Sequence, residues 1–203
     1  MHRRTLNLGI LGLVGASLLP GTAVAQSVDL DAALAPRVLG DPDAPLTMIE
    51  FSSLTCPHCA TFHRDSYKPI VETYVETGKL KFEMRDFPLD QYALRASAMA
   101  RAVDGKRYFA LIDVLFKQQS QWSRSQNPID ALKQIARLAG ISANVADAHM
   151  GNKELLDGIL NARLAAQRTY DVNSTPTFVI GDEVVRGAQP FATFQTVIDG
   201  MLA

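Results

Sequence analysis

Cys56 and Cys59 are the only two cysteines among the 203 residues, and they stand three positions apart with Pro57 and His58 between them. A disulfide joining them would close a very small loop, and the stabilisation gained from loop closure grows with loop length. Such a bond would be a poor structural staple. The spacing therefore indicates chemistry at the two sulfur atoms, either reversible disulfide exchange or metal binding.

The residues before and after Cys56 predict where its sulfur lies. Residues 46–52 (LTMIEFS) form an apolar run that predicts a central strand. Pro57 suits the first turn of a helix, because the N–H that proline lacks would be unpaired there. Cys56 then lies at a helix N-terminus, where free N–H groups and the positive end of the helix dipole stabilise a thiolate. Protonated His58 can add a charge or a hydrogen bond, so we expect a lowered pKa for Cys56.

Glu50 is the one charged residue in the predicted strand 46–52. A carboxylate in a buried strand needs a partner or a function, because burying an isolated charge is costly. Its apolar neighbours Ile49 and Phe51 argue for partial burial, although a solvent-facing position at the strand end would also fit the sequence. We expect Glu50 to take part in proton transfer near Cys59.

A metal site is the alternative use of the two cysteines. His63 follows Cys59 by four residues, which is one helical turn, and could join Cys56 and Cys59 as a third ligand. A tetrahedral zinc site needs a fourth ligand and usually more cysteine. We therefore expect no bound metal and interpret His63 as a surface or packing residue.

Hydrophobic periodicity predicts the elements around the cysteines. A helix is expected from Pro57 onward, kinked or broken at Pro69 and ended by Gly78. Residues 80–87 (LKFEMRDF) alternate between apolar and polar side chains and predict a second strand. The last predicted elements are a hairpin of strands at 177–180 and 183–186 and a helix at 191–201.

A helical block at about 91–171 separates the second strand from the hairpin. Apolar positions at helical spacing predict four helices, with Asn127 and Asn152 suited to begin two of them and Gly140 to end one. The order is β-α-β, a helical block, then β-β-α, which is an α/β arrangement. A C-x-x-C pair that follows a strand and opens a helix in such a frame is typical of a thioredoxin-like redox site.

The first 25 residues are expected to be an export signal rather than part of the fold. Arg3 and Arg4 precede an apolar stretch at 6–19 that is short for a membrane-spanning helix. Small residues at 23–25 predict cleavage after Ala25, through the general secretory route or, given the paired arginines, the twin-arginine route. Residues 26–45 then form a polar lead-in, and 46–203 the folded domain.

Composition narrows the classes of partner. With 47% hydrophobic and 20% charged residues, the chain resembles an ordinary globular protein. Its formal net charge is −1, and removal of the export signal with its two arginines makes it slightly more negative. No basic surface is indicated, so we expect no nucleic-acid partner.

The sequence resembles the DsbA family of periplasmic thiol:disulfide oxidoreductases. The resemblance rests on Glu50, six residues before Cys56, on the CPHC run, and on Ser-Thr-Pro-Thr-Phe at 174–178, and it covers about 38–203. It implies a thioredoxin-like fold with a helical domain inserted between the second and third strands. The helical block at 91–171 stands where that family carries its insertion.

The resemblance also implies an activity. Such a protein donates the Cys56–Cys59 disulfide to reduced, newly secreted polypeptides through a mixed disulfide at Cys56, with Cys59 the more buried partner. It uses no cofactor beyond this redox-active pair, and a DsbB-like membrane protein restores the disulfide. The family places a cis-proline at Pro176, so Thr175 and Pro176 are expected to bind substrate. We expect a periplasmic monomer.

Alternatives within and beyond this class remain. Thr175 stands where the best-known enterobacterial type carries valine and the disulfide isomerases carry threonine, so oxidase and isomerase or reductase activity both stay open. The short lead-in at 26–45 leaves no room for the dimerisation domain of the isomerases, and Pro57-His58 favours an oxidase. The alternative from another class is a non-catalytic periplasmic chaperone that binds unfolded chains beside Pro176.

Overall fold

A computed structural model describes residues 27–203; the expected export signal at 1–25 lies outside the described residues. Five strands form one sheet in the order β1-β3-β2-β4-β5. The two central strands, β2 and β3, are parallel, and every other pair is antiparallel. The strands are β1 (Arg37–Leu39), β2 (Leu46–Ser52), β3 (Leu80–Asp86), β4 (Thr177–Ile180) and β5 (Glu183–Arg186).

The central strand β2 places its side chains alternately in two different layers. Successive residues of a strand point to opposite faces of the sheet. Met48 packs into the larger core cluster, whereas Ile49 and Phe51 belong to a separate cluster on the other face. Glu50 therefore points to the same face as Met48, flanked by Met84 on β3 and Phe178 on β4.

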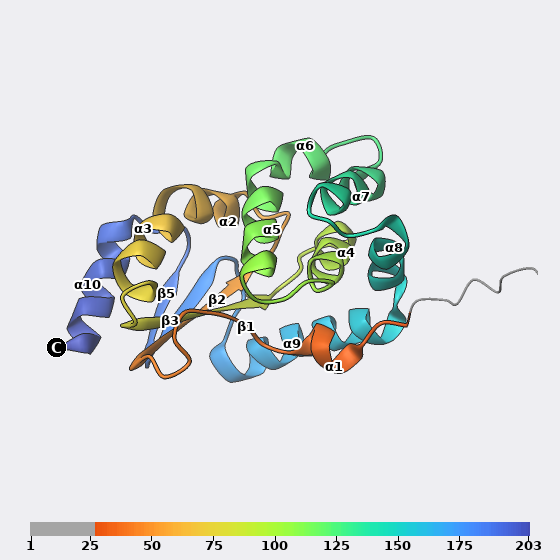
Figure 1. The fold of residues 1–203 in the computed structure, drawn as a ribbon. Coiled ribbons are helices and arrows are strands. Elements are labelled where there is room, and N and C mark those ends of the chain that lie inside the picture. The colour runs from red at the N-terminus through yellow and green to blue at the C-terminus, as the bar shows by residue number, and fades with distance from the viewer. Residues whose placement is uncertain (1–26) are drawn as a thin grey trace, which may run out of the picture.

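Helices cover both faces of the sheet (Figure 1). The helical segment that follows β2 and the C-terminal helix α10 (Phe191–Leu202) lie on one face, and α9 (Lys153–Tyr170) lies on the other. Phe194 and Ile198 of α10 are fully buried against the first face, and Ala166 of α9 is buried against the second. This is the predicted thioredoxin-like α/β fold, which is confirmed.

The predicted break of the helix at Pro69 is wrong, whereas the residues on either side of it do depart from regular α-helical geometry. The segment runs on as α2 (Pro57–Phe62), a π-helical turn η1 (His63–Tyr67), α3 (Lys68–Ile70) and a second π-helical turn η2 (Val71–Val75). Wider π-helical turns on either side accommodate a residue that has no N–H to donate, so the helix continues. It ends before Gly78, whose φ of 73° suits glycine.

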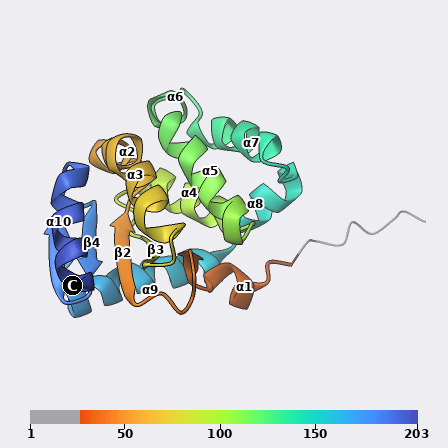
Figure 2. The same ribbon diagram turned by 60° about the vertical axis from the view of Figure 1, so that its left-hand side comes forward.

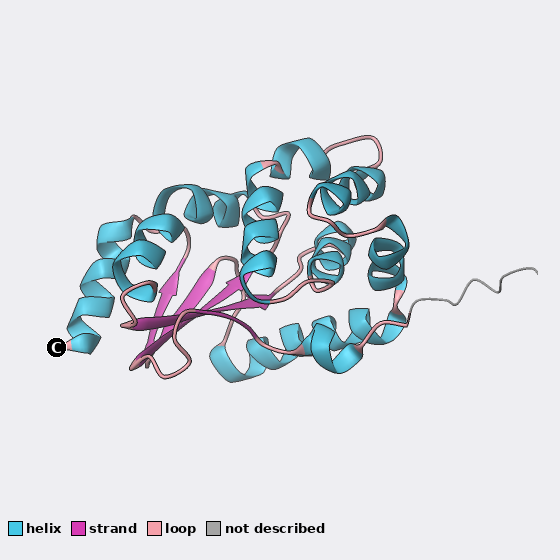
Figure 3. Ribbon diagram, in the orientation of Figure 1, coloured by secondary structure: helices cyan, strands magenta, loops and turns pink. Residues whose placement is uncertain are grey.

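The predicted helical block joins β3 to β4. Figure 2 shows it beside the sheet, and Figure 3 shows the strands gathered in one half of the molecule. Asn127 and Asn152 cap α7 and α9 as expected, with side-chain oxygens that accept backbone N–H bonds. The sequence did not predict α6 and α8. Besides α9, the block contains α4 (Gln91–Ala100), α5 (Gly105–Lys117), α6 (Gln119–Ser123), α7 (Pro128–Leu138) and α8 (Ala143–Gly151).

Residues 26–45 are more than a polar lead-in. They contain α1 (Leu30–Leu34) and strand β1, which pairs with β3 and forms one edge of the sheet. Arg37 is 4% exposed and donates hydrogen bonds to the carbonyls of Ala32, Ala33, Ala35 and Arg101. These bonds tie the first described residues to the end of α4.

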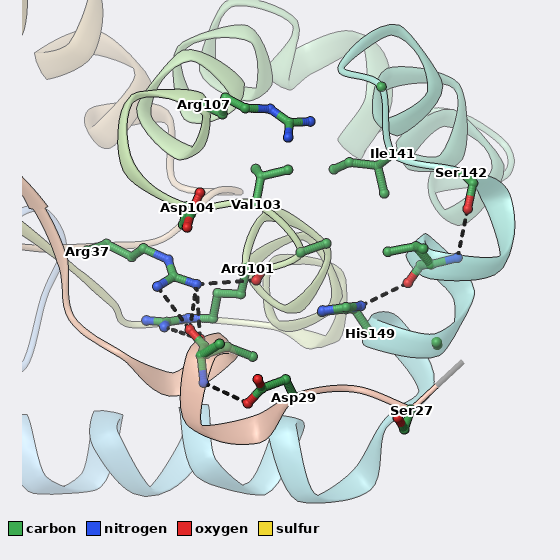
Figure 4. A pocket seen from close by; sticks show the side chains of 16 residues that line it. Ser27, Asp29, Arg37, Arg101, Val103, Asp104, Arg107, Ile141, Ser142 and His149 are labelled. Atoms are coloured by element: carbon green, nitrogen blue, oxygen red, sulfur yellow. Dashed lines mark hydrogen bonds between the residues drawn. The ribbon is translucent and has the colours of Figure 1, made fainter. Parts of the chain in front are cut away.

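Arg37 and Arg101 also line a cavity of about 520 Å³, where Figure 4 shows them beside Asp29 and Asp104. Arg101 is already engaged, since its Nε donates to Asp86 at 2.6 Å and its Nη1 to the carbonyl of Ala33 at 2.7 Å. The guanidinium groups therefore serve to hold the chain together at this place. Neither cysteine borders the cavity.

Candidate active site

Cys56 is the N-cap residue of α2, directly after the loop that leaves β2. Its backbone is extended (φ −77°, ψ 120°), and Pro57 occupies the first turn of the helix, as predicted. The backbone N–H of Cys56 donates to the carbonyl of Ser53 at 3.0 Å, which closes the loop tightly. The side chain is 5% exposed, so its sulfur lies just below the surface.

The pKa of Cys56 is lowered from 9.0 to about 5. The largest cause is a hydrogen bond from the Cys59 thiol, followed among the lowering effects by the side chain of Thr175 and the backbone N–H groups of Cys59 and His58. Burial opposes the shift. The sum of these donors stabilises a thiolate at the helix end, as the sequence predicted.

Cys59 differs sharply from Cys56. It is fully buried, and burial, followed by the hydrogen bond to Cys56 and the charge of Glu50, raises its pKa well above 9.0. Both cysteines are free thiols in this structure. The pair is therefore asymmetric, with one stabilised thiolate near the surface and one protonated thiol beneath it.

Thr175 and Pro176 face Cys56 from the start of β4. The peptide bond between them is cis, as the resemblance implied. The Cys56 thiol donates to the carbonyl of Thr175 across 3.3 Å, which joins residues 119 positions apart. The Thr175 hydroxyl is buried and has no hydrogen-bond partner among the groups of residues 27–203. It is free to donate to a Cys56 thiolate, and the Thr175 side chain is one cause of the lowered pKa of Cys56.

Glu50 is fully buried rather than partly buried as expected. Its Oε2 lies 3.0 Å from Nε2 of His63, whose side chain is 2% exposed. The sequence predicted a surface or packing role for His63 and missed this buried pair. The four-residue spacing places Cys59 and His63 on the same side of the helix, which is the signal that could have revealed it.

Two further residues depart from the expectation. The His58 side chain is exposed, and only its backbone N–H contributes to the lowered pKa of Cys56. Gln119, which the sequence did not single out, is buried and donates from Nε2 to the carbonyls of Leu54 and Cys56, each at 2.9 Å. The helical block thus contacts the cysteine loop directly.

Nowhere in 27–203 do three or more His, Cys, Asp or Glu side chains gather in a way that could hold a metal ion. None of the helices in that range is long and apolar enough to span a membrane.

Comparison with known proteins places this arrangement in a family. The family model described as thioredoxin matches residues 33–200. A crystal structure of alpha-DsbA1 from Wolbachia pipientis has a TM-score of 0.78 and 29% sequence identity, covering 85% of this chain and 95% of that one. The chain is a DsbA-type member of the thioredoxin family.

Relatives in sequence agree with this family. A protein from Rickettsia bellii named as a protein-disulfide oxidoreductase is 27% identical over 144 residues, which is 70% of this chain and 56% of the relative. Disulfide bond formation protein D of Bacillus subtilis is 22% identical over 80% of this chain and 75% of its own length. The DsbA-type chain described here thus spans little more than half the length of the rickettsial relative.

Proposed function

We propose that this protein is a periplasmic thiol:disulfide oxidoreductase that donates the Cys56–Cys59 disulfide to reduced, newly secreted polypeptides. The observation that carries the proposal is the asymmetry of the pair, since the pKa of Cys56 is lowered to about 5 and that of Cys59 is raised well above 9.0. A stabilised Cys56 thiolate favours the dithiol form. The disulfide form is then a strong oxidant of other thiols.

The reaction begins with the disulfide form. A substrate thiolate attacks Sγ of Cys56, the Cys56–Cys59 bond breaks, and Cys59 leaves as a thiolate that takes up a proton. A second substrate thiolate then attacks the substrate sulfur of the mixed disulfide and releases Cys56 as a thiolate. Two electrons pass from the substrate to the pair, and the substrate gains one disulfide.

Each site residue has a role in this scheme. Cys56 is the sulfur that forms the mixed disulfide, because it is the better leaving group and the one nearer the surface. Thr175 and cis-Pro176 bind the substrate backbone beside it, and the side chain of Thr175 helps to lower the pKa of Cys56. Glu50 transfers the proton that Cys59 gains or loses. Pro57 and His58 form the first turn of the helix at whose N-terminus Cys56 lies, and the backbone N–H of His58 helps to lower the pKa of Cys56.

The cellular setting completes the proposal. Export through the signal at 1–25, with cleavage after Ala25, delivers a monomer to the periplasm, where disulfides persist. A DsbB-like membrane protein returns the reduced pair to the disulfide form. The redox-active pair serves without any added cofactor.

The test is the redox equilibrium of Cys56–Cys59 in glutathione buffers, scored by thiol alkylation and mass. We expect an equilibrium far on the oxidising side, with half reduction at a low ratio of reduced to oxidised glutathione. A strongly reducing equilibrium would instead indicate a reductase kept charged by a membrane electron donor. Cys56→Ser is the matched control, because it cannot form the disulfide. If this variant handles unfolded substrate proteins as well as the wild type does, the protein is a non-catalytic chaperone.

A further inference from the structure

The exchange reaction at Cys56 does not explain why Glu50 and His63 form a buried pair. Its two side chains are 0% and 2% exposed and share one hydrogen bond of 3.0 Å. The other polar atoms, Oε1 of Glu50 and Nδ1 of His63, are buried without a hydrogen-bond partner within residues 27–203. Unpartnered buried polar atoms are uncommon and call for a functional explanation.

Glu50 acts on Cys59 but has no access to water. Its charge is one cause, after burial and the bond to Cys56, of the raised pKa of Cys59. Because the thiol of Cys59 is so weakly acidic, a proton must reach its sulfur whenever the disulfide opens and must leave before it closes. A fully buried carboxylate can hold that proton, yet it needs a second group to exchange it with solvent.

His63 borders a cavity that can supply this exchange. The cavity measures about 620 Å³ and lies between the helix after β2 and α5. The exposed side chains Arg64, Lys68 and Lys117 also line it, so it opens to solvent. The His63 ring is stacked at its wall between Tyr67 and Phe116, with centroids 4.6 and 4.2 Å away.

This cavity is distinct from the surface where substrate would bind. Its lining includes neither cysteine, neither residue of the cis peptide bond, and not Glu50. His63 therefore contacts the Glu50 carboxylate through Nε2 and also borders the cavity. Among the side chains hydrogen-bonded to Glu50 in the described residues, His63 is the one that does both.

We propose that His63 relays protons between Glu50 and water in this cavity, so that Cys59 gains and loses its proton by a route separate from the surface where substrate would bind. The inference rests on the proposed oxidoreductase function. When the disulfide opens, the Cys59 thiolate takes a proton from Glu50, Glu50 takes one from Nε2 of His63, and the imidazole takes one from water at the cavity wall, which leaves as hydroxide. Each step moves one proton, and reoxidation of the pair runs the sequence in reverse.

Tyr67 and Asp113, the other titratable groups near the pair, are less suited than His63 to relay protons. Burial, followed by the charges of Glu50 and Asp113, raises the pKa of Tyr67 far above the neutral range, so Tyr67 keeps its proton. Asp113 is paired with Lys117 at 2.6 Å on the cavity rim. Histidine is the side chain that exchanges protons readily near neutral pH.

The first experiment measures the rate at which dithiothreitol reduces the disulfide of the full mature protein near neutral pH. His63→Gln keeps an N–H donor for Glu50 but cannot carry a proton. We expect a rate at least about tenfold lower, short of the hundredfold typical of a positioned acid–base group because water in the cavity can partly replace the imidazole. His149→Gln, which changes a histidine distant from the site, is the matched control.

Two readouts separate the relay from a packing role. The relay slows reduction and reoxidation alike, so the glutathione equilibrium moves far less than either rate. A His63→Gln rate equal to that of the wild type would overturn the relay. If the wild type itself forms no reversible disulfide, the oxidoreductase function fails, whereas an active wild type with an equally fast variant defeats the relay alone.

Chemical rescue provides an independent test. His63→Ala leaves a space next to the cavity, which exogenous imidazole can enter. We expect imidazole to restore the rate, whereas pyrazole, a ring of the same size but too weakly basic to carry a proton at neutral pH, leaves it low. Equal acceleration by both compounds, or by neither, would overturn the relay and leave His63 as a packing residue.

Discussion

At the scale of single residues, the two thiols obtain opposite properties from positions three residues apart. Cys56 stands at the helix end, where the Cys59 thiol, Thr175 and backbone N–H groups all donate toward its sulfur. Cys59 lies one turn deeper, among buried side chains and near a carboxylate. Position along the first helical turn thus decides which sulfur is the leaving group.

The thiolate of Cys56 should be visible in its reactivity. With a pKa lowered to about 5, the alkylation rate of the reduced protein by iodoacetamide should stay nearly constant from pH 8 to about 6 and fall as the pH drops through about 5. The urea-unfolded protein is the control and should lose reactivity at a much higher pH. The same midpoint in folded and unfolded protein would contradict the stabilised thiolate.

Thr175 offers a second prediction at this scale. Thr175→Val removes the hydroxyl that supports the thiolate, so the pKa of Cys56 should rise by about one unit, because a hydrogen bond to a charged group contributes about 1.5 kcal/mol. The ultraviolet absorbance of the thiolate measures the shift, and the redox equilibrium should become less oxidising. Thr177→Val, whose hydroxyl donates to Ser174 instead, should leave the pKa unchanged.

At the scale of elements, the helical block takes part in the active site through Gln119. Its amide donates to the carbonyls of Leu54 and Cys56 and so connects the start of α6 to the loop between β2 and α2. The carbonyl of Cys56 also accepts the N–H of Ala60 in the first helical turn. The inserted block therefore helps to set the geometry of the helix end.

Replacement of Gln119 should be costly. Gln119→Leu leaves two buried carbonyls with one donor fewer, which should lower the free energy of unfolding by about 1–3 kcal/mol, and it should also shift the redox equilibrium of the cysteines. Gln121→Leu changes an exposed glutamine two residues later and should cost less than about 0.5 kcal/mol. Denaturant unfolding of both variants measures the difference. Equal unfolding free energies for Gln119→Leu and Gln121→Leu would show that the hydrogen bonds of Gln119 to the cysteine loop contribute little to stability.

Elements with a clear period could be predicted from the sequence, and short or tertiary features could not. Residues 46–52 and 80–86 appear as the two central strands because their apolar patterns are long enough to read. Strand β1 has three residues, too few for any period. Its place in the sheet depends on pairing with β3, which no local pattern reveals.

The same division holds within the active site. Cys56, Cys59 and Pro57 could be placed at a helix end from their spacing alone. The bond between Glu50 and His63 joins a strand to a helix, and that of Gln119 spans 63 residues to Cys56, so both depend on how the elements pack. Sequence reasoning found the reacting atoms but missed two of the groups that hold them.

At the scale of the whole molecule, the Cys56 thiolate links redox state to stability. Between pH 5 and 9 the unfolded dithiol binds a proton that the folded dithiol has lost, so folding is favoured increasingly as the pH rises. The stabilisation is complete above about pH 9 and disappears as the pH falls through about 5. The disulfide form has no thiol to titrate and lacks this contribution.

The stability difference between the two redox forms should therefore depend on pH. Denaturant unfolding of the dithiol and disulfide forms should show the dithiol gaining relative to the disulfide from pH 5 to pH 8. Cys56→Ser is the control for titration at this site, since its stability should lack this gain over the same range. A difference that stays constant with pH would mean that the thiolate is not stabilised by the fold.

The position of Gln119 has an optical consequence. Trp122, the only tryptophan of the chain, is buried one helical turn after Gln119 and donates from Nε1 to the carbonyl of Leu115 at 2.9 Å. Its indole thus belongs to α6, the helix whose Gln119 is hydrogen-bonded to the cysteine loop. The protein therefore carries its one intrinsic indole fluorophore on the helix that is hydrogen-bonded to the cysteine loop, and we expect its emission to differ between the dithiol and disulfide forms without any added label.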